Sequence, residues 1–263
     1  MPDFQTRFER LEFKYLIDEF TARDIRAQIA PFCRPDVHSL GGAPDRPGGA
    51  GYTINSLYLD TPALAFHQAK ERGDPNRIKL RVRTYSSTSP ATLEIKRRRS
   101  EVIDKTRAVI DRSRVADAAS GALLEPESAY FFTDFASIVA KAGASPKLTV
   151  RYEREAYESF VDDYARITFD RRIEVRTTPE WDLTPSDQGW CSFDEHWKTE
   201  HLTTPVVLEV KCQAACVPRW AIELVHGNAL LQTGFSKYSI GIYLLQMRDG
   251  LRGVRSRAAR ALS

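Results

Sequence analysis

Cysteine is scarce in this sequence, and its spacing is not that of a metal site. The four cysteines among 263 residues are Cys33, Cys191, Cys212 and Cys216. None belongs to a CxxC pair, and Cys212-x3-Cys216 has no matching second pair. Because a structural zinc site needs such pairs, we predict reduced thiols in a cytoplasmic protein instead.

Long apolar runs and a large net charge are also missing. No apolar run approaches the roughly 18 residues of a membrane-spanning helix, and Met1 to Gln5 has neither the basic nor the apolar region of a signal peptide. The net charge is +3, from 38 Lys and Arg against 35 Asp and Glu, whereas a general nucleic-acid binder is usually more basic. With 42% apolar and 28% charged residues the chain is globular. We therefore expect a cytoplasmic protein with one local site for an anionic ligand.

The stretch from Arg77 to Tyr85 alternates strictly between apolar and basic residues. A period of two predicts a strand with two different faces. One face carries Ile78, Leu80 and Val82, and the other carries Arg77, Lys79, Arg81, Arg83 and Tyr85. Cations side by side on a strand repel one another, so the basic face is stable only in water or opposite anions.

The same pattern returns along the whole chain. At least six predicted strands have an ionic face, and a seventh carries Arg154. The ionic residues of the six strands are, strand by strand, Lys14; Arg81 and Arg83; Glu94 and Lys96; Lys105; Arg166; and Glu209 and Lys211. Many strands and few long helices predict an antiparallel sheet or barrel. Alternation does not distinguish a solvated sheet face from the inside of a closed barrel. A lumen lined by Lys and Arg would require a polyanion.

Helices are predicted between these strands. Thr21 is expected to cap a helix that ends near Phe32, a second helix covers about 127–142, and a last apolar helix covers about 239–248. We expect residues 1–247 to form one domain and residues 248–263 to form a basic tail. The arginines of this tail are expected first of all to lie in solvent. The second interpretation is that they contact anionic lipid or polyphosphate.

Glutamate precedes lysine by two residues three times, at Glu12, Glu94 and Glu209. A carboxylate among cations is either an ion-pair partner or a ligand for a hard metal ion that bridges phosphates. Both interpretations stay open at each position. His196 and His201 are spaced by five residues, unlike the HExxH metal motif, so solvated or structural roles are expected for them.

Seven short motifs occur in an order that resembles one family. They are Glu12-x-Lys14-Tyr15, Arg81-x-Arg83-x-Tyr85, Glu94-x-Lys96, Tyr152-x-Arg154-x-x-Tyr157, Arg166 to Asp170, Leu208-Glu209-Val210-Lys211 and Phe235-Ser236-Lys237-Tyr238. Together they resemble the catalytic domain of the vacuolar transporter chaperone (VTC) polyphosphate polymerases and their bacterial relatives. These proteins belong to the CYTH, or triphosphate tunnel metalloenzyme, superfamily. The resemblance covers about residues 6–246.

The resemblance implies an α+β fold with an antiparallel β-barrel tunnel, a basic lumen and flanking helices. It implies an ATP-dependent polyphosphate polymerase, a phosphotransferase whose partners are ATP and polyphosphate. Glu209 would hold a divalent metal, Mn2+ or Mg2+, and Tyr152 and Ser236 would donate hydroxyl hydrogen bonds to phosphate. The cationic phosphate ligands would be Lys14, Arg81, Arg83, Lys96, Lys105, Arg154, Arg166, Lys211 and Lys237.

Two positions depart from the family pattern. Arg10 stands where wider superfamily members have the first glutamate of Glu-x-Glu-x-Lys, which argues against a triphosphatase that uses several carboxylates. Gly234 stands where a basic residue is expected in eukaryotic polymerases, and this difference would affect how efficiently the chain is elongated. We expect a protein without the regulatory and membrane domains of the eukaryotic complex, in which a link to a membrane would need a separate partner.

Three other functions remain as alternatives. A tripolyphosphatase or nucleoside triphosphatase could use the same fold. A non-catalytic polyphosphate- or nucleotide-binding module would keep the cations without metal-dependent turnover. A nucleic-acid binder is the last alternative, and it would interleave exposed aromatic residues with its basic ones.

Overall fold

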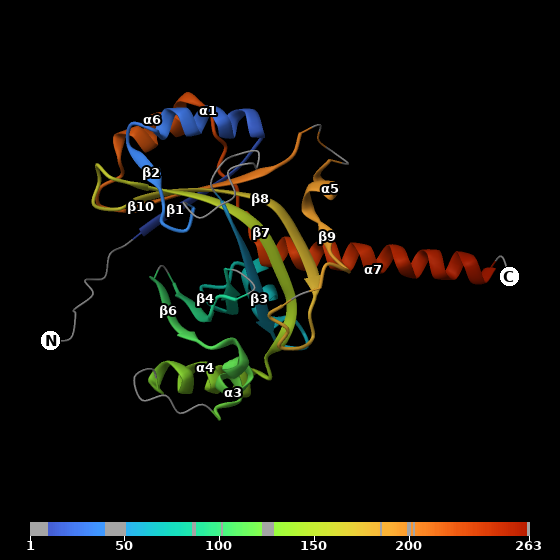
Figure 1. The fold of residues 1–263 in the computed structure, drawn as a ribbon. Helices are drawn as coiled ribbons and strands as arrows, with labels where there is room; N and C mark the ends of the chain where they lie inside the picture. The colour runs from blue at the N-terminus through green and yellow to red at the C-terminus, as the bar shows by residue number, and fades with distance from the viewer. Residues whose placement is uncertain are drawn as a thin grey trace. The chain divides into compact units, whose positions relative to one another are not determined.

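The fold is antiparallel and rich in strands (Figure 1). The computed structural model describes residues 10–39, 51–85, 88–100, 102–122, 129–184, 186–198, 201 and 203–261, with only the backbone of Arg10, Ala129 and 251–261. The strands are β1 (Arg10–Ile17), β2 (Cys33–Pro35), β3 (Tyr52–Asp60), β4 (Asn76–Thr84), β5 (Ala91–Arg99), β6 (Val102–Ile110), β7 (Ser145–Ser159), β8 (Ala165–Thr177), β9 (Cys191–Ser192) and β10 (Val206–Gln213). The helices are α1 (Glu19–Ile29), α2 (Ala65–Glu71), the 3-10 helix η2 (Arg112–Arg114), α3 (Val115–Ser120), α4 (Ala129–Ala142), α5 (Phe193–Trp197), α6 (Arg219–Gly227) and α7 (Lys237–Ala261).

The strands hydrogen-bond in the order β1-β10-β8-β7-β3-β4-β5-β6, while β2 pairs with β7 and β9 pairs with β8. Pairing is antiparallel between β1 and β10, β10 and β8, β2 and β7, β3 and β4, β4 and β5, β5 and β6, and β8 and β9. The predicted antiparallel α+β fold is therefore confirmed, as an open path of strands and not as a closed ring. None of the described helices combines the length and the apolarity needed to cross a membrane.

The chain divides into two compact units. Unit 1 comprises Met1–Tyr52, Tyr152–Arg172 and Asp194–Phe235, and unit 2 comprises Thr53–Arg151, Ile173–Phe193 and Ser236–Ser263. The long strands β7 and β8 each contribute residues to both units.

In unit 1, one face of the strands is covered by helices and the other is polar. Helices α1 and α6 lie along β1, β10 and β8 (Figure 1). Ile25 and Ile29 of α1 pack with Leu208 of β10 and Phe169 of β8, all at most 1% exposed. Each such side chain contributes about 1.5–3 kcal/mol when it leaves water. This packing turns the apolar residues of each strand toward the helices. The residues between them, which include the ionic ones, therefore lie on the opposite face of the sheet.

In unit 2 the strands also have a buried apolar face, and α4 packs against it. Leu80 of β4, Leu93 and Ile95 of β5, and Phe135 of α4 belong to a core with no exposed surface on these side chains. On the apolar face of the stretch from Arg77 to Tyr85, Leu80 and Val82 are therefore buried and Ile78 is partly buried, as a strand with two faces requires.

The predicted helix boundaries need correction. Thr21 does not cap the first helix: Asp18 does, because its carboxylate accepts a hydrogen bond of 2.8 Å from the Thr21 backbone N–H. The second predicted helix corresponds to α4, which begins at Ala129; residues 127 and 128 lie outside the described residues. The last helix begins earlier than predicted, at Lys237, and runs without a break to Ala261.

Candidate functional site

The register of β1, β10 and β8 brings five ionic residues of unit 1 to one face. Lys14 lies opposite Glu209, and Glu12 lies opposite Lys211, which in turn lies opposite Arg166. Residues two apart on a strand share a face, so both rows point the same way. The sheet thus brings together residues that are about 200 positions apart in the sequence.

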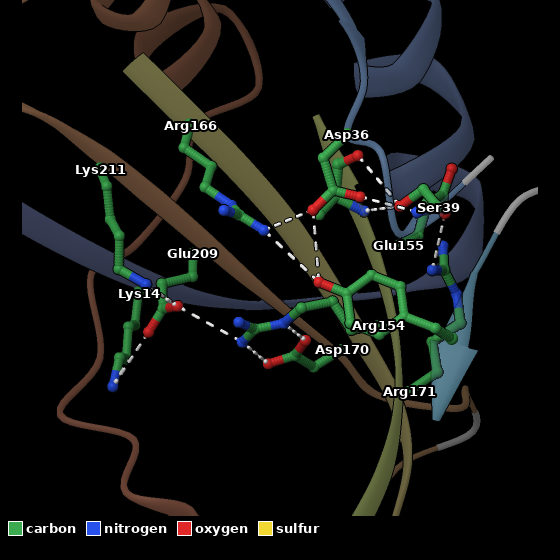
Figure 2. Close-up of polar contacts among 12 residues, drawn as sticks. Lys14, Asp36, Ser39, Arg154, Glu155, Arg166, Asp170, Arg171, Glu209 and Lys211 are labelled. Atoms are coloured by element: carbon green, nitrogen blue, oxygen red, sulfur yellow. Dashed lines mark hydrogen bonds and ion pairs between the residues drawn. The ribbon is translucent and has the colours of Figure 1, made fainter. Parts of the chain in front are cut away.

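Glu209 is the centre of this face. Its side chain is 7% exposed, and its Oε1 lies 3.3 Å from Lys14 Nζ. Its Oε2 lies 3.5 Å from a guanidinium nitrogen of Arg154 and also contacts Lys211 Nζ. Figure 2 shows these contacts converging on one carboxylate. Three cations share the single charge of Glu209.

The two lysines beside Glu209 titrate differently. Burial alone would lower the pKa of Lys14, but the carboxylates of Glu209 and Glu12 outweigh it and raise that pKa. For Lys211, burial outweighs the attraction of Glu209, and the nearby Arg154 adds to it, so its pKa is lowered. Lys14 is therefore the more firmly protonated of the two.

Arg154 is held by a buried carboxylate. Its Nε and one terminal nitrogen donate to the two oxygens of Asp170, each at 2.7 Å, and Asp170 has no exposed surface. Burial would lower the pKa of Arg154, but Asp170 raises it well above its usual value. The guanidinium also lies 5.4 Å from the ring centre of Tyr152. Arg154 is thereby fixed in orientation beside Glu209.

Arg166 points to a different partner. Its guanidinium donates to Asp36 at 2.6 Å (Figure 2). It also donates to the hydroxyl of Tyr52 at 3.4 Å and lies 3.3 Å from Glu158. The structure therefore does not bring Arg166 to Glu209, although both lie on the same face of the strands.

Charges on the described polar face of unit 1 are balanced. The predicted phosphate ligands of this unit, Lys14, Arg154, Arg166 and Lys211, each contact at least one carboxylate among Glu12, Asp36, Asp170 and Glu209. The ion-pair interpretation of Glu12 and Glu209 thus describes this structure. A phosphate group would have to compete with these carboxylates for the cations.

The carboxylates of unit 1 suit only one kind of metal site. Within the described residues, no three His, Cys, Asp or Glu side chains are placed to hold a metal ion together. Glu12 and Glu209, however, both contact Lys14 Nζ, at 3.0 and 3.3 Å. Mg2+ is typically held by one or two carboxylates and by substrate phosphates. These residues fit a metal that arrives with phosphate, and do not fit an all-protein cage.

The polar face of unit 2 is built on β3, β4, β5 and β6. One row of directly paired residues runs from Tyr58 through Arg81 and Glu94 to Arg107. Its neighbour on the same face contains three lysines, which are Lys79, Lys96 and Lys105.

Glu94 is the buried anion of this face. Its side chain is 2% exposed; it accepts a hydrogen bond from Arg81 and lies 3.7 Å from Arg83 and 3.1 Å from Lys105. Burial would raise the pKa of Glu94, but the three cations lower it to about 2. Glu94 therefore stays ionised and fixes cations from two strands around it.

Cations outnumber carboxylates on this face. Arg81, Arg83 and Lys105 share Glu94, while Lys96 forms no ion pair with any residue that the structure describes. Lys79 adds a further positive charge directly opposite Lys96. Unlike the face of unit 1, the described part of this face lacks enough anions of its own.

The start of α7 also carries predicted ligands. Ser236 lies just before the helix, and its hydroxyl accepts a hydrogen bond of 3.4 Å from Lys79 Nζ. Burial would raise the pKa of Tyr58, but positive charges lower it, those of Arg81 and Arg83 first and then that of Lys237. Ser236 thus lies beside Lys79 of β4, and Lys237 is near enough to Tyr58 of β3 to affect its pKa.

Comparison with known proteins agrees with this arrangement. The model of the VTC domain matches residues 9–246. The chain belongs to the VTC domain family. A search of curated proteins gave no match.

Among solved structures, this VTC domain is similar to a candidate adenylyl cyclase from Hippeastrum for which a dominant triphosphatase activity is described. The TM-score is 0.50 at 15% identity, over 89% of this chain and 96% of that chain. A candidate adenylate cyclase from Bacillus halodurans gives 0.47 at 12% identity, over 86% and 93%. The first likeness identifies the fold as the triphosphate tunnel fold.

Several residues of the VTC domain contribute to these clusters without a role predicted from sequence. The alternation places Lys79 on the face of Arg81, and this is the signal that could identify it. Asp170 ends the Arg166 motif, but nothing in the sequence indicates that it holds Arg154. Asp36 follows the short strand β2, and no pattern points to its contact with Arg166.

An anion such as polyphosphate, offered to the polar face of unit 2, is expected to bind more weakly as the pH rises from 7 to 9. Burial, together with Arg81 and Arg83, lowers the pKa of Lys105 to about 8, against the opposing effect of Glu94. Its side chain is 40% exposed, so solvent screens part of this shift. As the pH rises past that value, the ammonium loses its proton and its attraction for phosphate.

The measurement is the binding of polyphosphate by isothermal titration across this pH range. The Lys105→Arg variant is the control, because an arginine stays charged throughout. An equal decline in the two proteins would contradict the role given to Lys105.

Proposed function

We propose that this protein is an ATP-dependent polyphosphate polymerase. It transfers the γ-phosphoryl group of ATP to the end of a growing polyphosphate chain. Membership of the VTC domain family supports this function. The structural observation that carries it is the excess of cations on the polar face of unit 2, where Glu94 is shared by three cations and Lys96 has no ion pair among the described residues.

A linear polyanion satisfies this face better than water does. Like charges directly opposite one another on neighbouring strands are destabilising. Arginine binds phosphate oxygens with two parallel hydrogen bonds, and lysine acts as a mobile point charge. The face offers both types: Arg81 donates a hydrogen bond to Glu94, Arg83 lies 3.7 Å from it, and Lys96 has no ion pair among the described residues.

The proposed phosphate ligands keep the roles that the family resemblance implies. Tyr152 and Ser236 donate hydroxyl hydrogen bonds to phosphate oxygens. The cationic ligands are Lys14, Arg154, Arg166 and Lys211 in unit 1, and Arg81, Arg83, Lys96, Lys105 and Lys237 in unit 2.

Glu209, with Glu12 beside Lys14, would hold a divalent ion, Mn2+ or Mg2+, together with substrate phosphates. When bound, the ion neutralises charge that develops on the phosphate oxygens. Glu209 contacts three cations in the structure, which are Lys14, Lys211 and Arg154. A bound phosphate would replace Glu209 in part as the anion that pairs with them.

The reaction needs positioning and charge neutralisation more than covalent chemistry. An oxygen of the terminal chain phosphate forms a bond to the γ-phosphorus, the bond from that phosphorus to the β–γ bridging oxygen breaks, and ADP leaves. Arginines and lysines that are already fixed by carboxylates stabilise the negative charge without reorganising at that moment. Within unit 1, Arg154 is such a fixed group, because Asp170 holds it beside Glu209.

Product analysis tests the proposal. Purified protein with ATP and Mn2+ or Mg2+ should give a ladder of polyphosphate on a gel, and Lys96→Ala should abolish it. Lys141→Ala, which removes a lysine in the last turn of α4, is the matched control and should keep the ladder.

A second candidate is a tripolyphosphatase or nucleoside triphosphatase. The likeness to the Hippeastrum protein, for which a dominant triphosphatase activity is described, favours it. It would release free phosphate without a ladder. Tight polyphosphate binding without turnover would instead identify a non-catalytic binding module.

A further inference from the structure

Asp60, the last residue of β3, is a buried carboxylate that accepts four hydrogen bonds. It has no exposed surface. Its Oδ1 accepts from the backbone N–H groups of Thr61 and Phe66, at 2.7 and 2.9 Å, and its Oδ2 accepts from the backbone N–H of His67 at 2.9 Å. The fourth donor is the hydroxyl of Tyr238, 2.7 Å from Oδ2. This carboxylate thus joins three elements of unit 2, which are β3, α2 and α7.

Three of these hydrogen bonds serve the turn after β3 and the start of α2. The residue before α2, Leu64, has a left-handed backbone with a φ of 57° and gives the helix no side-chain cap. Phe66 and His67 are the second and third residues of α2, and N–H groups at these positions have no partner within a helix. Asp60 supplies the missing cap from outside the helix. Only its fourth hydrogen bond reaches α7.

Tyr238 fastens the first turn of α7 to β3. It is 3% exposed, and its ring stacks on that of Tyr58 with 4.9 Å between the ring centres. The hydroxyl of Tyr58 lies 3.5 Å from the guanidinium of Arg81. Burial and the carboxylate of Asp60 raise the pKa of the Tyr238 hydroxyl, so this group keeps the proton that it donates. Tyr238 is therefore held both by its ring and by its hydroxyl.

Lys237, a proposed phosphate ligand, comes directly before Tyr238 and is the first residue of α7. Ser236, one residue further back, has its hydroxyl 3.4 Å from Lys79 Nζ of β4. Consecutive Cα atoms are about 3.8 Å apart, so Tyr238 cannot move without moving Lys237. The bond from Asp60 to Tyr238 thus fixes where the backbone of Lys237 lies relative to β3.

We propose that Asp60 and Tyr238 are positioning residues that hold Lys237 in place to bind phosphate. Asp60 has no exposed surface, so it acts through Tyr238 and does not contact phosphate itself. The inference rests on the proposed function for the role of Lys237 as a phosphate ligand. It adds two residues that the cationic motifs do not identify, since neither carries a positive charge.

A double-mutant cycle on tripolyphosphate binding tests the proposal, by isothermal titration of the protein without metal. Lys237→Ala should weaken binding about tenfold or more, as the loss of one charged hydrogen bond does. Tyr238→Phe keeps the ring, removes only the hydroxyl and should weaken binding at least about threefold. In the Lys237→Ala background, Tyr238→Phe should add less than about twofold, because it acts through Lys237.

Tyr157→Phe is the matched control. Tyr157 of β7 also donates to a carboxylate, that of Glu155 at 2.5 Å, but it lies in unit 1 and is not a proposed phosphate ligand. It loses the same kind of hydrogen bond and should keep the tripolyphosphate affinity. Asp60→Asn is the second variant and should give the result of Tyr238→Phe in both backgrounds. If one of the two variants does not fold, the other decides.

Equal weakening by Tyr238→Phe with and without Lys237, or no weakening at all, would overturn the inference. Full affinity in Lys237→Ala would overturn it as well. Its failure is separable from that of the proposed function, because binding of tripolyphosphate needs no turnover. A protein that makes no polyphosphate but shows the coupling retains the positioning pair. A protein that makes polyphosphate and lacks the coupling does not have this pair.

Discussion

Replacing Glu209 by glutamine is expected to reduce phosphoryl transfer from ATP by at least about 100-fold, the usual effect of removing one preorganised electrostatic group from an active site. Glu209 is buried and contacts Lys14, Lys211 and Arg154, so its charge organises three proposed phosphate ligands. It is also the carboxylate proposed to hold the divalent ion. The amide keeps the size of the side chain and removes both functions.

Binding should respond differently from turnover. Long-chain polyphosphate should still bind to Glu209→Gln, because the substitution removes a negative charge and leaves every cation in place. Glu174→Gln is the matched control, since Glu174 pairs with an arginine, Arg151, at 2.9 Å but is not a proposed ligand. Unchanged turnover in Glu209→Gln, with the metal still required, would show that Glu209 does not hold the metal.

Replacing Asp170 by asparagine is expected to lower the free energy of unfolding by about 3 kcal/mol. Asp170 has no exposed surface and accepts two hydrogen bonds of 2.7 Å from Arg154. Losing its charge leaves a buried guanidinium with only Glu209, 3.5 Å away, as a carboxylate partner in the described site. Breaking a buried pair from one side costs about 3–5 kcal/mol, and Glu209 keeps the loss at the lower end.

Urea unfolding followed by circular dichroism measures this loss. Asp182→Asn is the control: Asp182 pairs with Arg176 at 2.6 Å, but its side chain is 38% exposed. An exposed pair contributes about 0–1 kcal/mol. Equal effects of the two substitutions would show that the Arg154–Asp170 pair is not a buried support of the site.

The strands and their faces could be predicted from the sequence because successive side chains of a strand point to opposite faces, so apolar and ionic residues alternate along it. The stretch from Arg77 to Tyr85 is β4 almost residue for residue, and the Glu94 and Lys96 stretch is β5. The boundaries of α1 were harder to predict, because Asp18 and Thr21 are both good capping residues and the sequence does not show which backbone turns first.

The partners of the ionic residues could not be predicted from alternation. Arg154 and Asp170 are 16 residues apart and meet through the contact of β7 with β8. Asp36 reaches Arg166 from a segment 130 residues away. The sequence shows ionic faces on many strands, but only strand pairing separates the balanced face of unit 1 from the cation-rich face of unit 2.

The most direct test of the central claim is the fate of the γ-phosphate. With γ-labelled ATP as the only phosphate donor, the label and the ADP formed should be measured together over time. A polymerase should place about one label in acid-precipitable polyphosphate for each ADP released, as transfer of one phosphoryl group requires. Label recovered as free orthophosphate, with ADP formed and no chain, would contradict the proposal and identify a hydrolase.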